Sequence, residues 1–401
     1  MKKALDEKYL PDKGTRERRV LVGLSGGINS FVMAYLLKIQ KYDLVAVTVL
    51  MKWGESKIDN SKILSCDVDN DKLTSIKEFC HQLGIAYHII QASDEFKDEV
   101  VEKWTTSRIT GTKSNQCWNC HELRMKLLYR KMLELQAEQL ATGHLAKIFH
   151  QESHHSAYVH TSNDEINDQS ALLSRLPHNI LDKLMLPLSD LQQKEINKLA
   201  ENFGLSSLPK VLKMHSCFNI PFSDGGHLVK AVAPNLLGPG DVVEQDKSNL
   251  GGHLGIHHYK YAEVLPLPHQ NLKMPLHLVK YSFMDKKIEV HSPDYFQRDH
   301  FFLKECRISE ETSLAEPLQG ILKVGESDYV DCWIYPKNFS CAHVVLESAC
   351  RILEGEIVSI IKKRGKNAKV YLTGKVQYIT KSQTDRDEEK KALKTDYTHD
   401  F

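Results

Sequence analysis

The sequence predicts an α/β domain built on a parallel sheet, followed by a small central β-rich domain and a C-terminal β-barrel. Two observations lead to this prediction. Apolar runs of strand length alternate with segments of helical periodicity up to about residue 210, which is typical of βαβ units. Beyond that point the helical periods give way to Gly-, Pro- and His-rich sequence and then to short alternating runs. A chain of 401 residues is also too long for one ordinary core.

The elements of the first domain follow one another in a regular order. The apolar run 20–24 predicts a strand, and after a Gly-rich turn a helix is expected from about Asn29. Strands are expected again at 42–53, 86–92 and 141–149, the last of them ending in a turn. Helical spacing is found between them at 73–85, 96–104 and 121–140. Two further helices, at 170–184 and 193–205, would close the domain.

The remaining chain predicts β structure. Residues 216–268 have few helical periods, and short alternating runs begin near Leu276. We therefore expect a parallel-sheet α/β domain at 1–215, a central β-rich domain at 216–270 and a barrel at 271–380. The polar tail 381–401 is expected to be flexible.

Composition excludes several classes of protein. Hydrophobic residues make up 41% and charged residues 26%, the balance of a globular protein. A net charge of +1 is not that of a chain that coats nucleic acid, although a local basic patch remains compatible with it. No apolar stretch is long enough for a membrane span, and the charged first residues lack the apolar region of a signal peptide. Nine scattered cysteines favour reduced thiols, so we expect a cytoplasmic protein.

A Gly-rich loop, Ser25 to Ser30, joins the first strand to the first helix. Glycines allow the backbone to approach a ligand closely, and amides at a helix N-terminus attract anions, so the loop predicts phosphate binding. The alternative is a Gly-Gly turn with a polar N-cap. No Lys follows the second Gly, which excludes a P-loop of the Walker type.

The cysteines leave several interpretations open. Cys117 and Cys120 form a CxxC motif before the long helix, where the helix dipole would lower the pKa of Cys120. A zinc site with His121, a redox pair and a single nucleophilic thiol are all compatible with this spacing. Cys217, taken alone, has the context of a buried core thiol.

The loop resembles the SGGxDS pyrophosphate loop of ATP pyrophosphatases, with Asn29 where those enzymes have Asp. This resemblance implies that the domain at 1–215 is an ATP-pyrophosphatase domain. The order of motifs in the first 260 residues or so resembles the tRNA-specific 2-thiouridylase family. The matching segments are Met51 to Trp53, Cys66 to Asp69, Gly111 to His121, Ala141 to His144, Asp168 to Ser170, Cys217 and Gly252 to Gly255. Departures are Asn29, Tyr259 to Glu263 in place of a Thr-x-Gly-Gln-Arg stretch, and Glu354 to Glu356 in place of Pro-Gly-Gln.

The resemblance implies an ATP-dependent RNA sulfurtransferase. It would adenylate the 2-carbonyl of the tRNA wobble uridine and replace that oxygen with sulfur carried as a cysteine persulfide. Cys120 and Cys217 would be catalytic, and no protein metal site is implied, although Mg²⁺ would accompany ATP. The residues implied to bind ATP are Gly23, Leu24, Ser25, Gly26, Gly27, Ile28, Asn29, Ser30, Met51 and Gly143. Those implied to bind RNA are Asn115, Gln116, Cys117, His144, Asp168 and Gln169.

The implied partners are the anticodon loop of tRNA and a protein that donates sulfur. Basic residues for RNA binding are Arg16, Arg18, Arg19 and the run 362–366, for which a solvated hairpin face is the alternative. Because Asn29 removes a charge from the loop, two other functions remain open. One is a degenerate paralogue that binds nucleotide and RNA without turnover, and the other is an ATP pyrophosphatase acting on another substrate.

Overall fold

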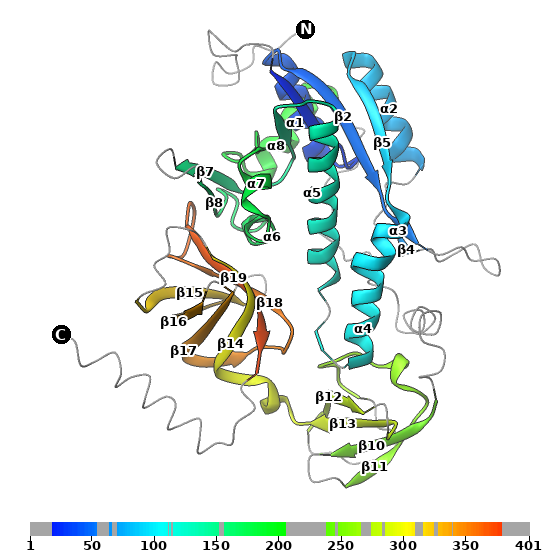
Figure 1. Ribbon diagram of the computed structural model, residues 1–401, viewed down its shortest axis with the longest axis vertical. Coiled ribbons are helices and arrows are strands. Elements are labelled where there is room, and N and C mark those ends of the chain that lie inside the picture. The colour runs from blue at the N-terminus through cyan, green and yellow to red at the C-terminus, as the bar shows by residue number, and fades with distance from the viewer. Residues whose placement is uncertain are drawn as a thin grey trace.

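The computed structural model consists of a parallel-sheet domain, a four-stranded sheet and a barrel (Figure 1). It describes residues 18–53, 64–65, 70–110, 112–113, 115–151, 156–205, 238–244, 248–265, 274–282, 285–308, 316–324, 328–338 and 340–378. Within these ranges, no helix is long and apolar enough to cross a membrane.

A five-stranded parallel sheet organises the first domain, with the strand order β5-β2-β1-β6-β9. Its strands are β1 (Arg19–Gly23), β2 (Asp43–Leu50), β5 (Ala86–Gln91), β6 (Gln139–Ala141) and β9 (Leu184–Met185). From β1 the chain passes to β2 and β5 on one side, and later to β6 and β9 on the other. The order therefore reverses between β1 and β6, and ligands of open α/β sheets bind at such a switch point, beyond the carboxyl ends of the strands.

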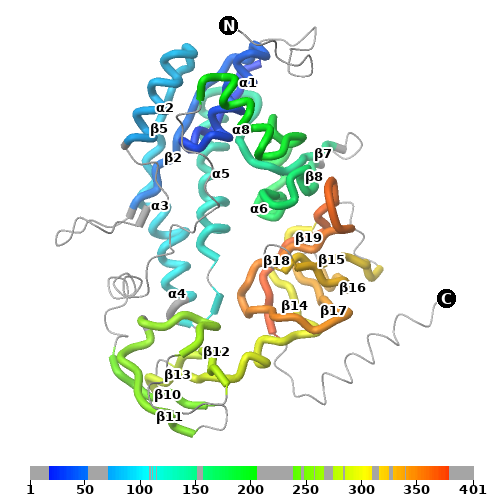
Figure 2. Tube along the Cα trace, turned by 180° about the vertical axis from the view of Figure 1, so that it is seen from behind, coloured from blue at the N-terminus to red at the C-terminus, as the bar shows by residue number. Residues whose placement is uncertain are grey.

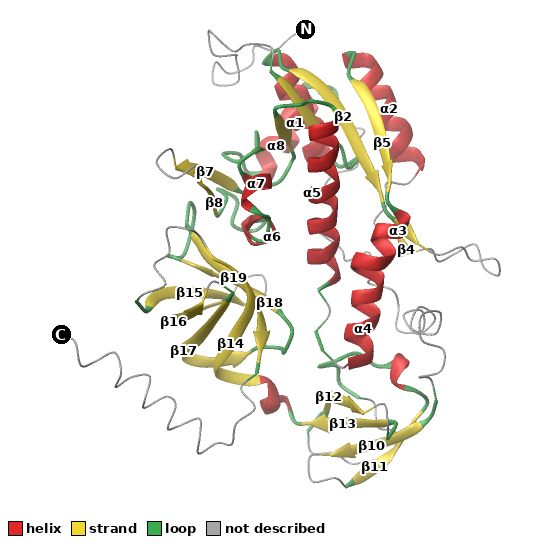
Figure 3. Ribbon diagram, viewed as in Figure 1, coloured by secondary structure: helices red, strands yellow, loops and turns green. Residues whose placement is uncertain are grey.

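Helices cover both faces of this sheet (Figure 3). Side chains alternate along β1, so that Val20 and Val22 pack on one face and Leu21 on the other. The first face is covered by α1 (Ile28–Ile39), α2 (Asn70–Leu83) and α8 (Gln193–Asn202). The second is covered by the π-helical turn η2 (Lys97–Val101), α5 (Gln116–Glu134) and α7 (His178–Leu181). Double coverage explains the nearly continuous apolar strands that the sequence displays.

Shorter elements complete the domain. They are α3 (Ser93–Phe96), α4 (Glu102–Thr110), α6 (Ser170–Ser174) and two antiparallel pairs, β3 (Lys52–Trp53) with β4 (Leu64–Ser65) and β7 (Lys147–Gln151) with β8 (Ser156–His160). Helices α4 and α5 extend beyond the sheet towards the four-stranded sheet (Figures 1 and 2). There α4 contacts β12 and the turn η4 (Ile256–His258).

The four-stranded sheet has the order β11-β10-β13-β12. Its strands are β10 (Gly240–Glu244), β11 (Asn249–His253), β12 (His277–Ser282) and β13 (Lys287–His291). The domain boundary that the sequence predicts at 270/271 therefore falls inside this sheet. Strand β13 pairs in parallel with β10, which precedes it by more than 40 residues, and local alternation carries no sign of such long-range pairing.

A closed six-stranded barrel follows, as the sequence predicts. The turn η5 (Pro293–Phe296) leads into β14 (Gln297–Ile308), β15 (Leu318–Val324), β16 (Asp328–Asn338), β17 (Cys341–Arg351), β18 (Ile357–Ile361) and β19 (Val370–Gln377). Alternate side chains of these strands fill the interior with a separate apolar core. Closure leaves no open edge. The barrel meets the first domain through β19, which contacts α6 and β8, and through the segment 354–357 between β17 and β18.

Candidate nucleotide and cysteine site

The loop after β1 has the geometry of an anion site. Gly26 has φ 77°, a conformation that favours glycine, and the Ser30 hydroxyl donates to the Gly27 carbonyl at 2.7 Å. The Ser25 amide donates to Ser30 Oγ at 3.3 Å, which closes the turn at the start of α1. Among the described residues, the amides of Gly26, Ile28 and Asn29 have no backbone acceptor. These donors at the N-terminus of a twelve-residue helix can hold a phosphate group.

The loop is also anchored to the neighbouring strand β2. The Leu24 amide donates to the Val47 carbonyl at 2.9 Å, and Thr48 Oγ1 donates to the Leu24 carbonyl at 2.8 Å. Met51, which follows β2, is fully buried. The loop and the end of β2 therefore form one fixed unit at the carboxyl edge of the sheet.

Asn29 forms a reciprocal amide pair with Gln193 at the start of α8. Gln193 Nε2 donates to Asn29 Oδ1 at 2.8 Å, and Asn29 Nδ2 donates to Gln193 Oε1 at 3.1 Å. The backbone N–H of Gln193 in turn donates to Asp164 Oδ2 at 2.8 Å. Asn29 thus ties α1 to α8, a role that an aspartate could perform only in part because it has no N–H to donate. Sequence reasoning placed Gln193 at the start of an expected helix, but it missed the contact of this residue with Asn29.

Gly143 lies directly against the start of α1. A Cβ atom at this position would come within 2.9 Å of the Asn29 carbonyl carbon and 3.0 Å of the Ser30 nitrogen. Only glycine allows the two backbones to approach so closely. This contact joins the loop after β6 to the loop after β1 at the switch point. The structure therefore brings Gly143 and the predicted nucleotide loop together.

Cys120 is linked to this switch point through two histidines. It lies near the start of α5 and is 6% exposed, and His121 follows it. The ring of His121 packs edge-on against the ring of His144 at a centroid distance of 4.9 Å. His144 follows Gly143, and its Nδ1 lies 2.8 Å from Thr142 Oγ1. A continuous path of contacts and chain neighbours thus runs from Cys120 to the nucleotide loop.

The electrostatics of this path differ from the sequence expectation for Cys120. Burial raises the pKa of the Cys120 thiol, and the charge of Arg124 and its hydrogen bond to the thiol only partly oppose this effect. The helix N-terminus therefore does not produce a low-pKa thiol, and the expectation of a favoured thiolate is wrong. Burial lowers the pKa of His144 to about 4, with a further contribution from Arg124. Burial, His144 and Arg124 lower the pKa of His121 well below its usual value, so both imidazoles are neutral at pH 7.

The segment before α5 is held by the barrel. Asn115 Nδ2 donates to the Gly355 carbonyl at 2.5 Å, and the Ile357 amide donates to Asn115 Oδ1 at 3.3 Å. The Lys113 amide donates to the Glu354 carbonyl at 3.0 Å. The barrel segment that departs from the family pattern thus positions the segment leading to Cys120.

Asp168 and Gln169 are held by contacts with other parts of the protein. Asp168 is 4% exposed in its side chain, accepts bonds from the Ser162 amide and the Ser170 hydroxyl, and lies 3.8 Å from Lys323 on β15. Burial raises the pKa of Asp168 despite these partners. Gln169 Oε1 accepts from the Leu145 amide at 3.0 Å, beside His144. These contacts fix the loop after β8; they do not test the predicted RNA contacts of Asp168 and Gln169.

Other predicted residues can be placed only in part. Gln116 and Cys117 form the first turn of α5 and are half-buried. Cys217, together with Cys66 to Asp69, lies outside the described residues, so its distance from Cys120 is not tested. Within the described part of the chain, no group of three or more His, Cys, Asp or Glu side chains could hold a metal ion.

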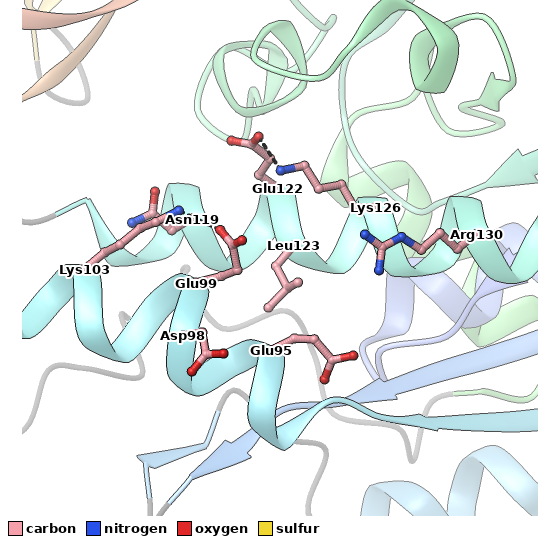
Figure 4. A pocket seen from close by; sticks show the side chains of 9 residues that line it. All are labelled: Glu95, Asp98, Glu99, Lys103, Asn119, Glu122, Leu123, Lys126 and Arg130. Atoms are coloured by element: carbon pink, nitrogen blue, oxygen red, sulfur yellow. Dashed lines mark hydrogen bonds and ion pairs between the residues drawn. The ribbon is translucent and has the colours of Figure 1, made fainter.

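A charged cavity of about 280 Å³ lies between α5 and the segment formed by α3, η2 and α4 (Figure 4). Glu122 pairs with Lys126 at 2.9 Å within it, and Glu99 pairs with Lys103 at 2.6 Å. Both pairs join residues four apart on one helix, which is how exposed helices commonly pair their charges. The residues of the nucleotide loop do not line this cavity, which is lined by Glu95, Asp98, Glu99, Lys103, Asn119, Glu122, Leu123, Lys126 and Arg130.

The chain is similar to known proteins over most of its length. Residues 18–220 match the family model described as tRNA methyl transferase HUP domain. The tRNA-specific 2-thiouridylase MnmA of Clostridium perfringens is 30% identical over 244 residues, which are 61% of this chain and 67% of the relative. A second such enzyme, MnmA 1 of Fusobacterium nucleatum, is 27% identical over 387 residues, covering 94% of this chain and 92% of the relative.

Among solved structures, a 4-thiouridine synthetase in complex with RNA and bound ATP is 13% identical. It covers 47% of this chain and 41% of its own, with a TM-score of 0.33. The family model spans about half of the chain, and the relatives extend the match over the barrel. The chain belongs to the tRNA-specific 2-thiouridylase MnmA family.

Proposed function

We propose that the protein is an ATP-dependent sulfurtransferase that converts the wobble uridine of tRNA to 2-thiouridine. The path of contacts from the nucleotide loop through Gly143, His144 and His121 to Cys120 is the observation that carries this proposal. Replacement of a carbonyl oxygen by sulfur requires an activated oxygen and a sulfur carrier at one place. A nucleotide loop connected to a cysteine in this way meets that requirement.

ATP would be bound by the segment Gly23 to Ser30, with Gly143 beside it and Met51 near the adenine. The free amides at the start of α1 would hold the phosphates, and their orientation is fixed before binding by the bonds of Leu24 and Ser30. ATP supplies the adenylyl group that makes the 2-carbonyl oxygen a leaving group, with release of pyrophosphate.

The target uridine would be turned out of its stack, because a stacked base hides the 2-carbonyl from the protein. Asn115, Gln116 and Cys117 would border this base, since they lie three to five residues before Cys120. His144, Asp168 and Gln169 would contact the anticodon loop. Asn115 and Gln169 already have protein partners, and these partners would fix where each residue meets the RNA.

Sulfur would arrive on Cys217 as a persulfide from a donor protein. The terminal sulfur attacks C2 of the adenylated uridine and AMP leaves with the former carbonyl oxygen. The thiol of Cys120, which is protonated at rest, would lose its proton to solvent and attack Cys217 Sγ. This attack would release 2-thiouridine and leave a Cys120–Cys217 disulfide for reduction by a cellular thiol. In an alternative order, Cys120 first releases hydrosulfide from the persulfide, and the hydrosulfide attacks C2.

Magnesium would be held mainly by the ATP phosphates and water, as is usual for this ion. Asn29, at the position where the resemblance implies a carboxylate, brings no charge, and its Oδ1 already accepts from Gln193. We therefore derive no step through a protein-bound metal. Function on tRNA fits the cytoplasmic location that we propose.

The second candidate is a paralogue that binds nucleotide and RNA without turnover, and the neutral Asn29 favours it. Mass spectrometry of tRNA nucleosides from a deletion strain separates the two. We expect 2-thiouridine to be lost and to be restored by the native gene, but not by the Cys120→Ser or Cys217→Ser variants. Cys350→Ser, at a half-buried barrel position, is the matched control that should restore it. An unchanged nucleoside profile would leave only the second candidate or an ATP pyrophosphatase with another substrate.

Asn29→Asp tests the loop itself. In an active enzyme, the returned charge should strengthen magnesium-dependent pyrophosphate release, by up to roughly 3 kcal/mol for one well-positioned group. The lost donor to Gln193 would offset part of this gain. In a degenerate binder the same variant should tighten Mg-ATP binding and leave turnover near zero. Robust native release that the substitution does not change would contradict a defect at Asn29.

A further inference from the structure

The hairpin β7–β8 has one buried face and one aromatic face. Ala157 and Val159 are buried in the core of the first domain, with Ile148 packed against them. Because side chains alternate, Phe149 and Tyr158 point to the opposite face. Phe149 is 42% exposed, unusual for so large an apolar side chain on a short hairpin.

Three rings are gathered on this outer face, which we call the ring platform: Phe149, Tyr158 and His160. Phe149 and Tyr158 are direct cross-strand partners with ring planes 17° apart. The ring of His160 lies 4.3 Å from that of Phe149 and 5.5 Å from that of Tyr158. Cross-strand pairing stabilises the hairpin, but it does not require a partly exposed ring.

Cations of the barrel border the ring platform. Lys369 Nζ lies 4.5 Å from the centre of the Tyr158 ring. The turn between β18 and β19 is fastened to β8, because His160 Nδ1 lies 3.0 Å from the Asn367 carbonyl and the Thr161 amide donates to the Ala368 carbonyl. Four further cations on this turn are exposed, namely Lys362, Lys363, Arg364 and Lys366.

Acidic groups offset only part of this charge. Asp190, which lies between β9 and α8, pairs at 2.7 Å with Lys147 of the hairpin, and Asp331 lies 3.3 Å from Arg364. Among the described residues, the three lysines of the turn form no ion pair. The surface thus combines stacked rings with a row of positive charge, which matches the two chemical features of single-stranded nucleic acid.

We propose that the ring platform stacks an unpaired base of the bound RNA while the turn 362–366 contacts the adjoining phosphates. The inference rests on the proposed function for its RNA, and it adds a contact outside the nucleotide and cysteine site. β8 leads directly into the loop of Asp168 and Gln169, and Gln169 binds the Leu145 amide beside His144. A base held on the ring platform would therefore fix the RNA relative to the residues that border the target uridine.

Binding of fluorescein-labelled single-stranded RNA to the full chain, followed by anisotropy, tests the proposal. Phe149→Leu should weaken binding about five- to hundredfold, the range for loss of one stacked base, whereas Phe149→Trp should retain it. Inorganic polyphosphate has charge but no bases, so its affinity should be the same for the native chain and both variants. Leu254→Ala removes another exposed apolar side chain, 79% exposed and beyond the end of β11 in the four-stranded sheet, and should change neither affinity.

A triple variant, with Lys362, Lys363 and Lys366 each changed to Gln, should weaken binding of RNA and polyphosphate alike and reduce the salt dependence. Equal RNA binding by Phe149→Leu and the native chain would overturn the proposal, as would equal losses of RNA and polyphosphate affinity in Phe149→Leu.

RNA-stimulated pyrophosphate release distinguishes a failure of the ring-platform proposal from a failure of the proposed function. Stimulation that Phe149→Leu leaves intact at every RNA concentration overturns only the ring platform, whereas a native chain that binds no RNA overturns the proposed function as well. Thermal unfolding of each variant shows whether a loss of RNA binding is caused by misfolding. If Phe149→Leu is misfolded, RNA binding by Phe149→Trp tests the proposal, because this variant keeps an aromatic ring and should bind as the native chain does.

Discussion

The two parts of the candidate site are held in different ways. The nucleotide loop is anchored by its own sheet, through Val47, Thr48 and the first turn of α1. The segment that leads to Cys120 is anchored by the barrel, through the backbone of Glu354, Gly355 and Ile357. The first part should therefore form whenever the parallel sheet forms, whereas the second depends on docking of a domain more than 200 residues away in sequence.

This difference suggests a division of roles. A preformed loop can bind nucleotide without reorganisation, which favours electrostatic stabilisation of the leaving phosphates. A cysteine segment that is fixed by another domain can respond to whatever that domain binds. Gly143, the histidine pair, Asn115 and Arg124 are the points where the two parts can be separated by mutation.

Gly143→Ala should have the largest effect, because it disturbs the contact between the loop after β6 and the start of α1. The new Cβ would meet backbone atoms of Asn29 and Ser30 at 2.9 and 3.0 Å, and neither can move without moving the loop. We expect a stability loss of about 1–3 kcal/mol and roughly hundredfold weaker ATP-dependent turnover. Urea unfolding and pyrophosphate release measure these two effects.

Gly252→Ala is the matched control, since its Cβ would meet only the Gly240 carbonyl at 3.5 Å. It should change neither quantity. Normal turnover by Gly143→Ala would mean that the approach of the two loops is not needed for ATP binding.

The histidine pair should make stability depend on pH. The pKa of His144 is about 4 in the folded chain, lowered by burial and then by Arg124, against about 6.5 for an unfolded histidine. The unfolded chain therefore binds more protons between these values, and stability falls as pH drops from 6.5 towards 4. At pH 5 the loss from this one group is about 2 kcal/mol relative to pH 7.5.

Urea unfolding at pH 5 and 7.5 measures this loss. His144→Gln should remove most of the pH dependence due to this residue. His81→Gln, on an exposed position of α2, should not. If the free energy of unfolding of His144→Gln falls with pH as steeply as that of the native chain, another group dominates the acid destabilisation.

Sequence reasoning found the loop and the fold because both depend on local patterns. The spacing of Gly26, Gly27 and Ser30 between a strand and a helix is readable without a structure, and so is the alternation of strands and helices. The closed barrel was expected from short alternating runs. The neutral amide of Asn29 was recognised as a departure, but its pairing with Gln193 was not, because that contact spans 164 residues.

The cysteine segment was harder to predict for the same physical reason. Its position near a helix N-terminus suggested a lowered pKa for Cys120, whereas its burial depends on packing that no local pattern contains. The bond between Asn115 and Gly355 likewise joins two regions that only the complete fold brings together. Cys217 remains a prediction.

Asn115→Asp should release the barrel from the cysteine segment. It keeps an acceptor for the Ile357 amide but replaces the donor to the Gly355 carbonyl with a carboxylate oxygen. Loss of one buried hydrogen bond typically costs about 1–3 kcal/mol, which predicts roughly ten- to hundredfold faster hydrogen exchange at the Lys113 and Ile357 amides. Exchange at Leu24 should stay as in the native chain, since its bond to Val47 lies within the sheet. Equal acceleration at Leu24 would show that the two parts of the site are not independent.

Arg124→Met should give the smallest effect and isolates the electrostatics of the cysteine segment. Burial raises the pKa of Cys120, while Arg124 lowers it through its charge and a hydrogen bond, so the native thiol is protonated at pH 7. Because only the thiolate is alkylated, the labelling rate of Cys120 should rise about tenfold per pH unit up to pH 9 without a plateau. Removing the cation should raise the pKa of Cys120 further and slow its labelling at pH 8 several-fold.

Mass spectrometry of peptides distinguishes Cys120 from the half-buried Cys117 in this experiment. Arg130→Met, farther along the same helix, removes an equal charge away from the thiol and is the matched control. Arg124 also donates to the Val49 carbonyl at 3.2 Å, so its loss could loosen α5 from the sheet and increase access. The two effects have opposite signs: slower labelling means that charge controls Cys120, whereas faster labelling means that burial does. The second result would make the docking of α5, and with it the barrel contact at Asn115, the step that exposes Cys120.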